Sequence, residues 1–245
     1  MITKRFSRNV ALILLASSLF ASIPFVVSAG ISRGSPDQAG QRIPIEEFLK
    51  KIPDAAAQWA EDRKRDLRDR PEAILEVLGL EPGMRVGEAG TGAGYFTFFL
   101  SAIVGERGVV YANDNDAYML AALEHYAKGS FGGLKNIVPV LGADEDPLFP
   151  RHDLDMIVLY GSFHDFTRRA EWLRNAKRYL KSGGRLAIID GYYPDHGALT
   201  KEAVIELGSQ AGYRLAFYKD CSSEYDLGEG GKGFRSNHVH ILVRD

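Results

Sequence analysis

Three alternating glycines after a short apolar run constrain this chain more than any other feature of its sequence. The glycines are Gly90, Gly92 and Gly94, with Thr91 between the first two and the acidic Glu88 just before them. An apolar, aromatic-rich segment of residues 95–104 follows, and it is long enough for a short buried helix. Glycines let a strand turn sharply into a helix and let a ligand approach the backbone, while the helix start offers N–H donors. The stretch therefore predicts a strand–turn–helix unit with a ligand at its turn.

Apolar strand-like segments and helix-like segments alternate along the rest of the chain. We expect strands at residues 84–86, 109–113, 136–141, 156–160, 185–190, 213–218 and 237–243. We expect helices at 44–51, 55–70, from 71, at 95–104 and 116–128, from a cap at Thr167, and at 200–210. This alternation indicates an α/β fold with a doubly wound, mainly parallel sheet. The glycines at positions 228, 230, 231 and 233 predict a mobile loop between the last two strands.

Polar residues fall at the carboxyl ends of four of the predicted strands. Glu88, Asp114 and Asp144 each follow a strand, and so does the segment after Tyr160. Ligands of doubly wound sheets bind outside these ends, so we expect the four points to share one site. A nicotinamide or flavin dinucleotide is disfavoured, because Tyr95 stands where the dinucleotide fingerprint needs its last glycine.

Two of these stretches resemble motifs of the class I S-adenosylmethionine (SAM)-dependent methyltransferases. Residues 86–94 are similar to the family's first motif, and residues 110–116 are similar to the second. Residues 181–186 resemble the turn before the fifth strand, and the resemblance as a whole covers about residues 71–244. It implies a Rossmann-like sheet of seven strands, the last one antiparallel, and SAM as cofactor.

The resemblance also implies a role for each cofactor-binding residue. Gly90, Thr91, Gly92 and Gly94 would pass the methionine part of SAM, and Glu88 would act near its amino group. Asp114 would accept hydrogen bonds from both ribose hydroxyls, and Asn115 would lie against the adenine. Asp144 is similar to the residue that receives the adenine amino group, with Asp146 as a competitor.

His164 is the candidate catalytic residue, because it follows the fourth predicted strand and histidine titrates near neutrality. A purely structural histidine bonded to its loop is the alternative. Gly161 stands where many relatives carry an acidic residue or asparagine, which disfavours amine methylation. The favoured function is a SAM-dependent methyltransferase with an unidentified small-molecule acceptor. The alternatives are an exported, non-catalytic nucleoside-ligand-binding protein and a different enzyme in which His164 is an acid or base.

The first thirty residues predict export from the cytoplasm. Lys4, Arg5 and Arg8 precede an uncharged stretch at 10–27, and small residues end at Ala29. This pattern is typical of a signal peptide cleaved after Ala29, which indicates a periplasmic or secreted protein. An uncleaved membrane anchor is the alternative. We therefore divide the chain into a signal peptide (1–29), a linker and helical extension (30–70) and a SAM-binding domain (71–245).

Composition narrows the remaining classes of partner. A formal net charge of −2 argues against a general nucleic-acid surface. The single cysteine, Cys221, excludes an internal disulfide, and His238 and His240 have no third ligand at a recognisable spacing, so no metal is predicted. The charged run at 61–66 is interpreted as a solvated helix face, with a lid over the site near Trp59 as the alternative.

Overall fold

The computed structural model describes residues 50, 54–129, 133–191, 199–228 and 231–245 of the 245-residue chain. The description below concerns the compact unit Pro53–Asp245. The predicted signal peptide, its cleavage point at Ala29 and the helix expected at 44–51 lie outside the described residues, apart from Lys50. Within the described ranges, no helix is both long enough and apolar enough to cross a membrane.

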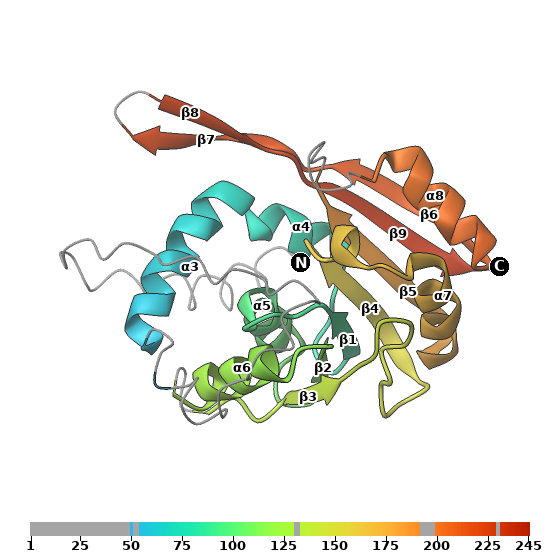
Figure 1. The fold of residues 1–245 in the computed structure, drawn as a ribbon, viewed down its shortest axis with the longest axis horizontal. Helices are drawn as coiled ribbons and strands as arrows, with labels where there is room; N and C mark the ends of the chain where they lie inside the picture. The colour runs from blue at the N-terminus through green and yellow to red at the C-terminus, as the bar shows by residue number, and fades with distance from the viewer. Residues whose placement is uncertain (1–49, 51–53, 130–132, 192–198, 229–230) are drawn as a thin grey trace, which may run out of the picture. The chain divides into compact units, whose positions relative to one another are not determined.

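Seven strands form one sheet in the order β3-β2-β1-β4-β5-β9-β6 (Figure 1). They are β1 (Arg85–Ala89), β2 (Val109–Asp114), β3 (Ile137–Leu141), β4 (Leu154–Tyr160), β5 (Leu180–Asp190), β6 (Tyr213–Asp220) and β9 (His238–Arg244). The first five pair in parallel, and β9 runs antiparallel to both β5 and β6. The expected seven-stranded, mainly parallel sheet is therefore confirmed, with its antiparallel strand last in sequence.

The α-helices in the described ranges are α3 (Ala55–Asp69), α4 (Pro71–Leu78), α5 (Tyr95–Val104), α6 (Ala117–Gly129), α7 (Arg169–Ala176) and α8 (Lys201–Gln210). Four of these helices connect strands of the sheet, and the other two, α3 and α4, precede β1. Strand order reverses at β1, since β2 lies on one side of it and β4 on the other. Right-handed crossovers then place the helices before and after this reversal on opposite faces of the sheet.

Strand β4 lies at the centre of the sheet and is buried along nearly its whole length. Its run of apolar residues is what a strand covered on both faces requires. Ile157 and Leu159 join one core cluster with Trp172 of α7 and Tyr213 of β6. This core fixes β4 and β5, so the residues at their carboxyl ends sit on a rigid base.

Two local predictions are wrong. Thr167 does not cap α7, because the helix begins at Arg169, its N-cap is Arg168, and that cap makes no side-chain hydrogen bond. The segment expected as a mobile loop forms the antiparallel hairpin β7 (Ser223–Gly228) and β8 (Gly231–Arg235). The reason is visible at Gly233, where an added Cβ would lie 2.3 Å from the Tyr225 ring. Gly233 therefore makes room for cross-strand packing in the hairpin.

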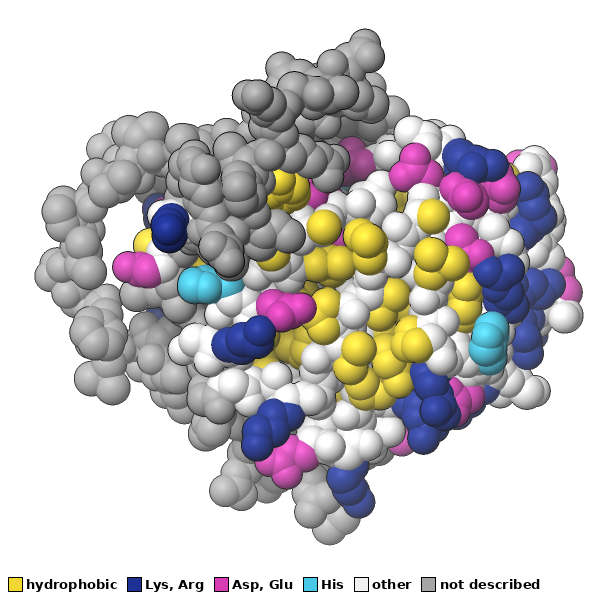
Figure 2. Space-filling view, turned by 60° about the horizontal axis from the view of Figure 1, so that its bottom comes forward, with side chains coloured by type: hydrophobic (Ala, Val, Ile, Leu, Met, Phe, Trp, Pro, Cys, Tyr) yellow, Lys and Arg dark blue, Asp and Glu magenta, His cyan; other side chains and the backbone are white. Residues whose placement is uncertain are grey.

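The surface carries hydrophobic side chains among charged ones (Figure 2). Large exposed hydrophobic residues include Val138 and Leu141 of the edge strand β3, and Leu148 in the loop that follows it. Exposed apolar residues of this kind are ordinary on a soluble domain.

Candidate cofactor and acceptor site

The glycine loop joins the end of β1 to the start of α5 at the point where strand order reverses. Gly90 N and Thr91 N donate hydrogen bonds to Asn113 O at 2.9 and 3.0 Å, which tie the loop to the end of β2. Gly90 has a φ of 73°, and a Cβ there would lie 2.4 Å from Ser162 Cβ. At Gly92, by contrast, an added Cβ would meet nothing within 4 Å among the described residues. The loop is therefore packed at its first glycine and open at its second.

Glu88 lies beneath this loop and is almost completely buried, at 2% exposure. Its Oε2 accepts hydrogen bonds from Thr97 Oγ1 at 2.5 Å and from Thr91 Oγ1 at 3.4 Å. Burial raises the pKa of the Glu88 carboxyl to about 8, and these two hydroxyls oppose the rise only in part. The carboxyl is consequently protonated at neutral pH, and a cation bound close to it would favour its ionised form.

Asp114 stands at the carboxyl end of β2, beside the open glycine. Its Oδ2 accepts from Gly92 N at 2.8 Å, and its Oδ1 accepts from Asp116 N at 3.0 Å. Burial raises its pKa, while the backbone donors of Asp116 and Gly92 act in the opposite direction. Each oxygen of a carboxylate has a further acceptor position, so Asp114 can take two more hydrogen bonds.

Asp144 and Asp146, the two candidates for the residue that receives the adenine amino group, differ in their contacts. Asn115 Nδ2 donates to Asp144 Oδ1 at 2.8 Å, so these residues come together next to Asp114. Asp146 is buried and receives Tyr179 OH at 2.6 Å and a guanidinium N–H of Arg178. Its carboxylate is held inside the domain, and this leaves Asp144 as the carboxylate paired with Asn115.

His164 lies on the short 3₁₀ helix η1 (Phe163–Asp165), which follows β4. Its Nδ1 is 2.9 Å from Asp190 Oδ1, and its backbone N–H donates to Asp190 Oδ2 at 2.9 Å. Since an ionised carboxylate only accepts, Nδ1 carries the proton and Nε2 is the basic nitrogen. Nε2 lies 3.5 Å from Asp165 Oδ2.

Asp190, which ends β5, was missed in the sequence analysis. It is 5% exposed and also accepts from Gly191 N at 2.8 Å, so three donors fix its carboxylate. Its place at the end of a predicted strand could have marked it as a site residue. Its contact with His164 could not be predicted, because the two residues are 26 positions apart in the sequence.

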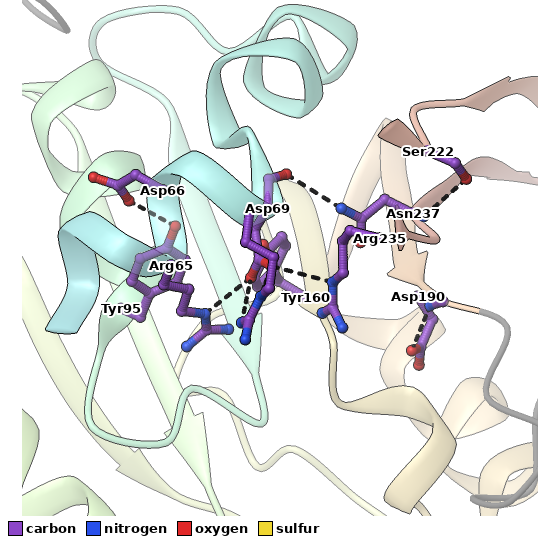
Figure 3. Close-up of polar contacts among 11 residues, drawn as sticks. Arg65, Asp66, Asp69, Tyr95, Tyr160, Asp190, Ser222, Arg235 and Asn237 are labelled. Atoms are coloured by element: carbon purple, nitrogen blue, oxygen red, sulfur yellow. Dashed lines mark hydrogen bonds and ion pairs between the residues drawn. The ribbon is translucent and has the colours of Figure 1, made fainter. Parts of the chain in front are cut away.

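Helix α3 also reaches the site and contributes residues that the sequence analysis treated as a charged surface (Figure 3). Tyr95 OH donates to Asp66 Oδ1 at 2.7 Å, and the Arg65 guanidinium carbon lies 3.8 Å from the centre of the Tyr95 ring. Asp69, whose side chain is fully buried, accepts from Tyr160 OH at 3.1 Å. The compact unit begins at Pro53, and so it includes this helix together with the sheet.

The two alternating histidines of β9 do not form a metal site with other described residues. His238 Nδ1 is 2.7 Å from Tyr218 OH, and His238 Nε2 is 3.0 Å from Ser236 Oγ. His240 is 2% exposed, and burial lowers its pKa to about 4, so it is neutral at physiological pH. Over the described ranges, no three His, Cys, Asp or Glu side chains are grouped to hold a metal ion.

The glycine loop, the carboxylates at the strand ends and the strand order together define a Rossmann-like domain built to bind a nucleoside ligand. A family model described as "Methyltransferase domain" matches residues 87–188. A SAM-dependent methyltransferase from Aquifex aeolicus is similar in structure, with 25% identity, a TM-score of 0.59, and coverage of 82% of this chain and 100% of that one. A TehB-like SAM-dependent methyltransferase from Corynebacterium glutamicum shares the fold, at 18% identity and a TM-score of 0.57.

Sequence comparison finds relatives with a more specific name. The ubiquinone/menaquinone biosynthesis C-methyltransferases UbiE of Shewanella baltica and Shewanella frigidimarina are each 32% identical over 129 residues. The match covers 52% of this chain and 50% of each of those proteins, so the chain spans about half the length of these curated relatives. Residues 87–188 therefore match a methyltransferase domain, and the fold is that of SAM-dependent methyltransferases, whose cofactor is SAM.

Proposed function

We propose that the protein transfers a methyl group from SAM to a small-molecule acceptor. The observation that carries this proposal is the hydrogen bond from Gly92 N to Asp114 Oδ2, 2.8 Å long. This hydrogen bond joins the open part of the glycine loop to the Asp114 carboxylate, which can accept two further hydrogen bonds. A ligand with a diol beside a polar chain fits such a pair, and SAM has both groups.

The residues at the rim of the sheet fit the parts of SAM in turn. Asp114 would hold the ribose hydroxyls, while Asn115 and Asp144 would hold the adenine. The methionine part would pass the glycine loop at Gly92, where the backbone is open to a ligand. When bound, SAM supplies an electrophilic methyl group on a sulfonium sulfur.

His164 acts as the general base, and Asp190 positions it. Asp190 holds Nδ1–H, which fixes the tautomer and the ring orientation, so that Nε2 takes the proton that the acceptor atom loses. An acceptor that needs this help is a hydroxyl or an acidic carbon. The name C-methyltransferase of the relatives supports carbon as the methylated atom, and Gly161 in place of an acidic or amide side chain argues against an amine.

Two further points about partners and location belong to this proposal. The acceptor is a small molecule and not a nucleic acid, which the net charge of −2 supports. The protein is exported by its N-terminal segment, which the basic residues and the uncharged stretch before Ala29 support. Sequencing of the natural protein should find a terminus at Gly30. An intact Met1 on a cytosolic protein would contradict export, and an intact Met1 in membranes would favour the anchor.

Binding measurements on the purified chain test the function. Titration calorimetry should show binding of S-adenosylhomocysteine, the demethylated product, much more tightly than adenosine. Equal affinity for the two ligands without methyl transfer would favour the non-catalytic nucleoside-binding alternative. No heat with either ligand at millimolar concentration would refute the proposal.

His164→Ala tests the catalytic assignment once an acceptor is found. Removal of a general base should lower kcat by about 10²–10⁴-fold while the affinity for S-adenosylhomocysteine stays the same. Asp190→Asn should show a smaller loss and a shifted pH profile, because the amide no longer fixes the tautomer of the ring. His125→Ala, on the exposed side of α6, is the matched control and should retain full activity. Full turnover in His164→Ala would show that the histidine is structural.

A further inference from the structure

The proposed methionine site contains one charge that the rim residues do not balance. The amino and carboxylate groups of an amino acid share one carbon, so their N and C atoms are only about 2.5 Å apart. If the amino group lies near Glu88, the carboxylate lies near it too. The predicted cofactor-binding side chains Glu88, Asp114 and Asp144 are all acidic, and none of them attracts a carboxylate. A cation is therefore needed close to the glycine loop.

Arg65 of α3 lies in the right place. Its guanidinium carbon is 3.8 Å from the centre of the Tyr95 ring and 5.5 Å from that of Tyr160. Tyr95 is the first residue of α5 and directly follows Gly94, the last glycine of the loop. Burial raises the pKa of the Glu88 carboxyl, and the positive charge of Arg65 is one of the influences that oppose this rise.

Arg65 is held in this position by one of its five N–H groups. Its Nε donates to Asp69 Oδ2 at 3.0 Å, and the aromatic face of Tyr95 supports the plane of the guanidinium. In Figure 3, Arg65 and Arg235 approach Asp69 from opposite sides. The side chain is thus oriented before any ligand arrives, which reduces the entropy that binding would cost.

Asp69 does not neutralise this cation, because it serves two other arginines. Arg68 Nε lies 2.7 Å from Asp69 Oδ1, and Arg235 Nε lies 3.1 Å from the same oxygen. Burial lowers the pKa of Arg235, and the charges of Arg68 and Arg65 act in the same direction. Three guanidinium groups thus surround the Asp69 carboxylate, while Asp62 and Asp66 of the same helix also lie within electrostatic reach of Arg65.

We propose that Arg65 binds the methionine carboxylate of SAM, which makes α3 a part of the cofactor site. The inference rests on the proposed function, since it assumes that SAM binds at the glycine loop. It adds a cation from outside the two sequence motifs. It also gives a reason why α3 is fixed over Tyr95 and Tyr160.

Two ligands and two variants test the role of Arg65. S-Adenosylhomocysteine carries the carboxylate, whereas 5′-methylthioadenosine has the same nucleoside without the amino-acid group. Arg65→Gln should weaken S-adenosylhomocysteine binding by about 10- to 100-fold, the range for loss of a charged hydrogen bond. Binding of 5′-methylthioadenosine should be unchanged in the same variant, which also shows that the variant is folded. Titration calorimetry measures both.

Arg68→Gln is the matched control, because it removes an equal charge from the same carboxylate but leaves Arg65 on Tyr95. Its affinity for S-adenosylhomocysteine should change by less than about threefold, and Arg65→Lys should recover part of the loss. An equal loss in Arg65→Gln and Arg68→Gln would overturn the proposal, since the effect would then act through Asp69. Wild-type affinity in Arg65→Gln would also overturn it. If wild type binds neither nucleoside, the proposed function itself has failed.

Discussion

Glu88 makes the stability of the ligand-free protein depend on pH in an unusual direction. Burial raises the pKa of its carboxyl from 4.5 to about 8. Between these two values the folded protein holds a proton that the unfolded chain has lost. The free energy of unfolding must therefore fall as pH rises through this window, and this contribution is fully present only below about pH 4.5.

The size of the effect follows from the same two values. A proton that is bound in the folded state but not in the unfolded state changes the free energy of unfolding by about 1.4 kcal/mol per pH unit. From pH 5.5 to 7.5, Glu88 should thus lower the free energy of unfolding by roughly 2.5 kcal/mol. Asp62 of α3, whose pKa burial raises to about 6, adds a contribution of the same sign. A comparison with a variant is needed to separate the two carboxyls.

Glu88→Gln provides that comparison, because the amide keeps the shape and an acceptor for Thr97 but does not titrate. Urea unfolding of both proteins without ligand, at several pH values from 5.5 to 7.5, gives the free energies by linear extrapolation. The contribution of Asp62 is common to both proteins and cancels in the difference. We expect wild type to lose about 2.5 kcal/mol relative to the variant across this range. A constant difference between the two proteins would refute the reasoning, since it would mean that Glu88 ionises normally in the folded state.

Two further predictions concern the neighbouring glycine loop and strand end. Asp114→Ala should weaken S-adenosylhomocysteine binding by about 10- to 100-fold in titration calorimetry, because two charged hydrogen bonds to the ribose are lost while the hydroxyls regain water; equal binding would refute the assignment. Gly90→Ala should lower the free energy of unfolding by about 3 kcal/mol or more, because its Cβ would collide with Ser162. Gly92→Ala should cost only about 1–2 kcal/mol, the penalty of its left-handed backbone, and equal melting temperatures for the two variants would contradict this.

The first half of the sheet and its ligand edge were predictable from sequence because their determinants are local. The apolar run of β4 and the glycines after β1 each predict their local structure from a stretch of about ten residues. Strand periodicity and glycine conformation act at that range, so the order of elements and the positions of Glu88 and Asp114 followed directly. The error at the β7–β8 hairpin has the same origin. Gly233 looked like a mobile loop residue because Tyr225, which its missing side chain accommodates, lies on the opposite strand.

The part of the site that involves α3 depends instead on contacts between residues far apart in the chain. Tyr160 donates to Asp69 across 91 residues, and Asn237 Nδ2 donates to the Asp69 carbonyl oxygen across 168 residues. No pattern in the charged sequence of α3 distinguishes Asp69, which is fully buried, from Glu61, which is exposed. Only the fold makes that distinction, because β4 and β8 must first be in place to supply the partners that a buried carboxylate requires. Residues of this kind can be identified only from the tertiary structure, which shows which charged side chains are buried away from water.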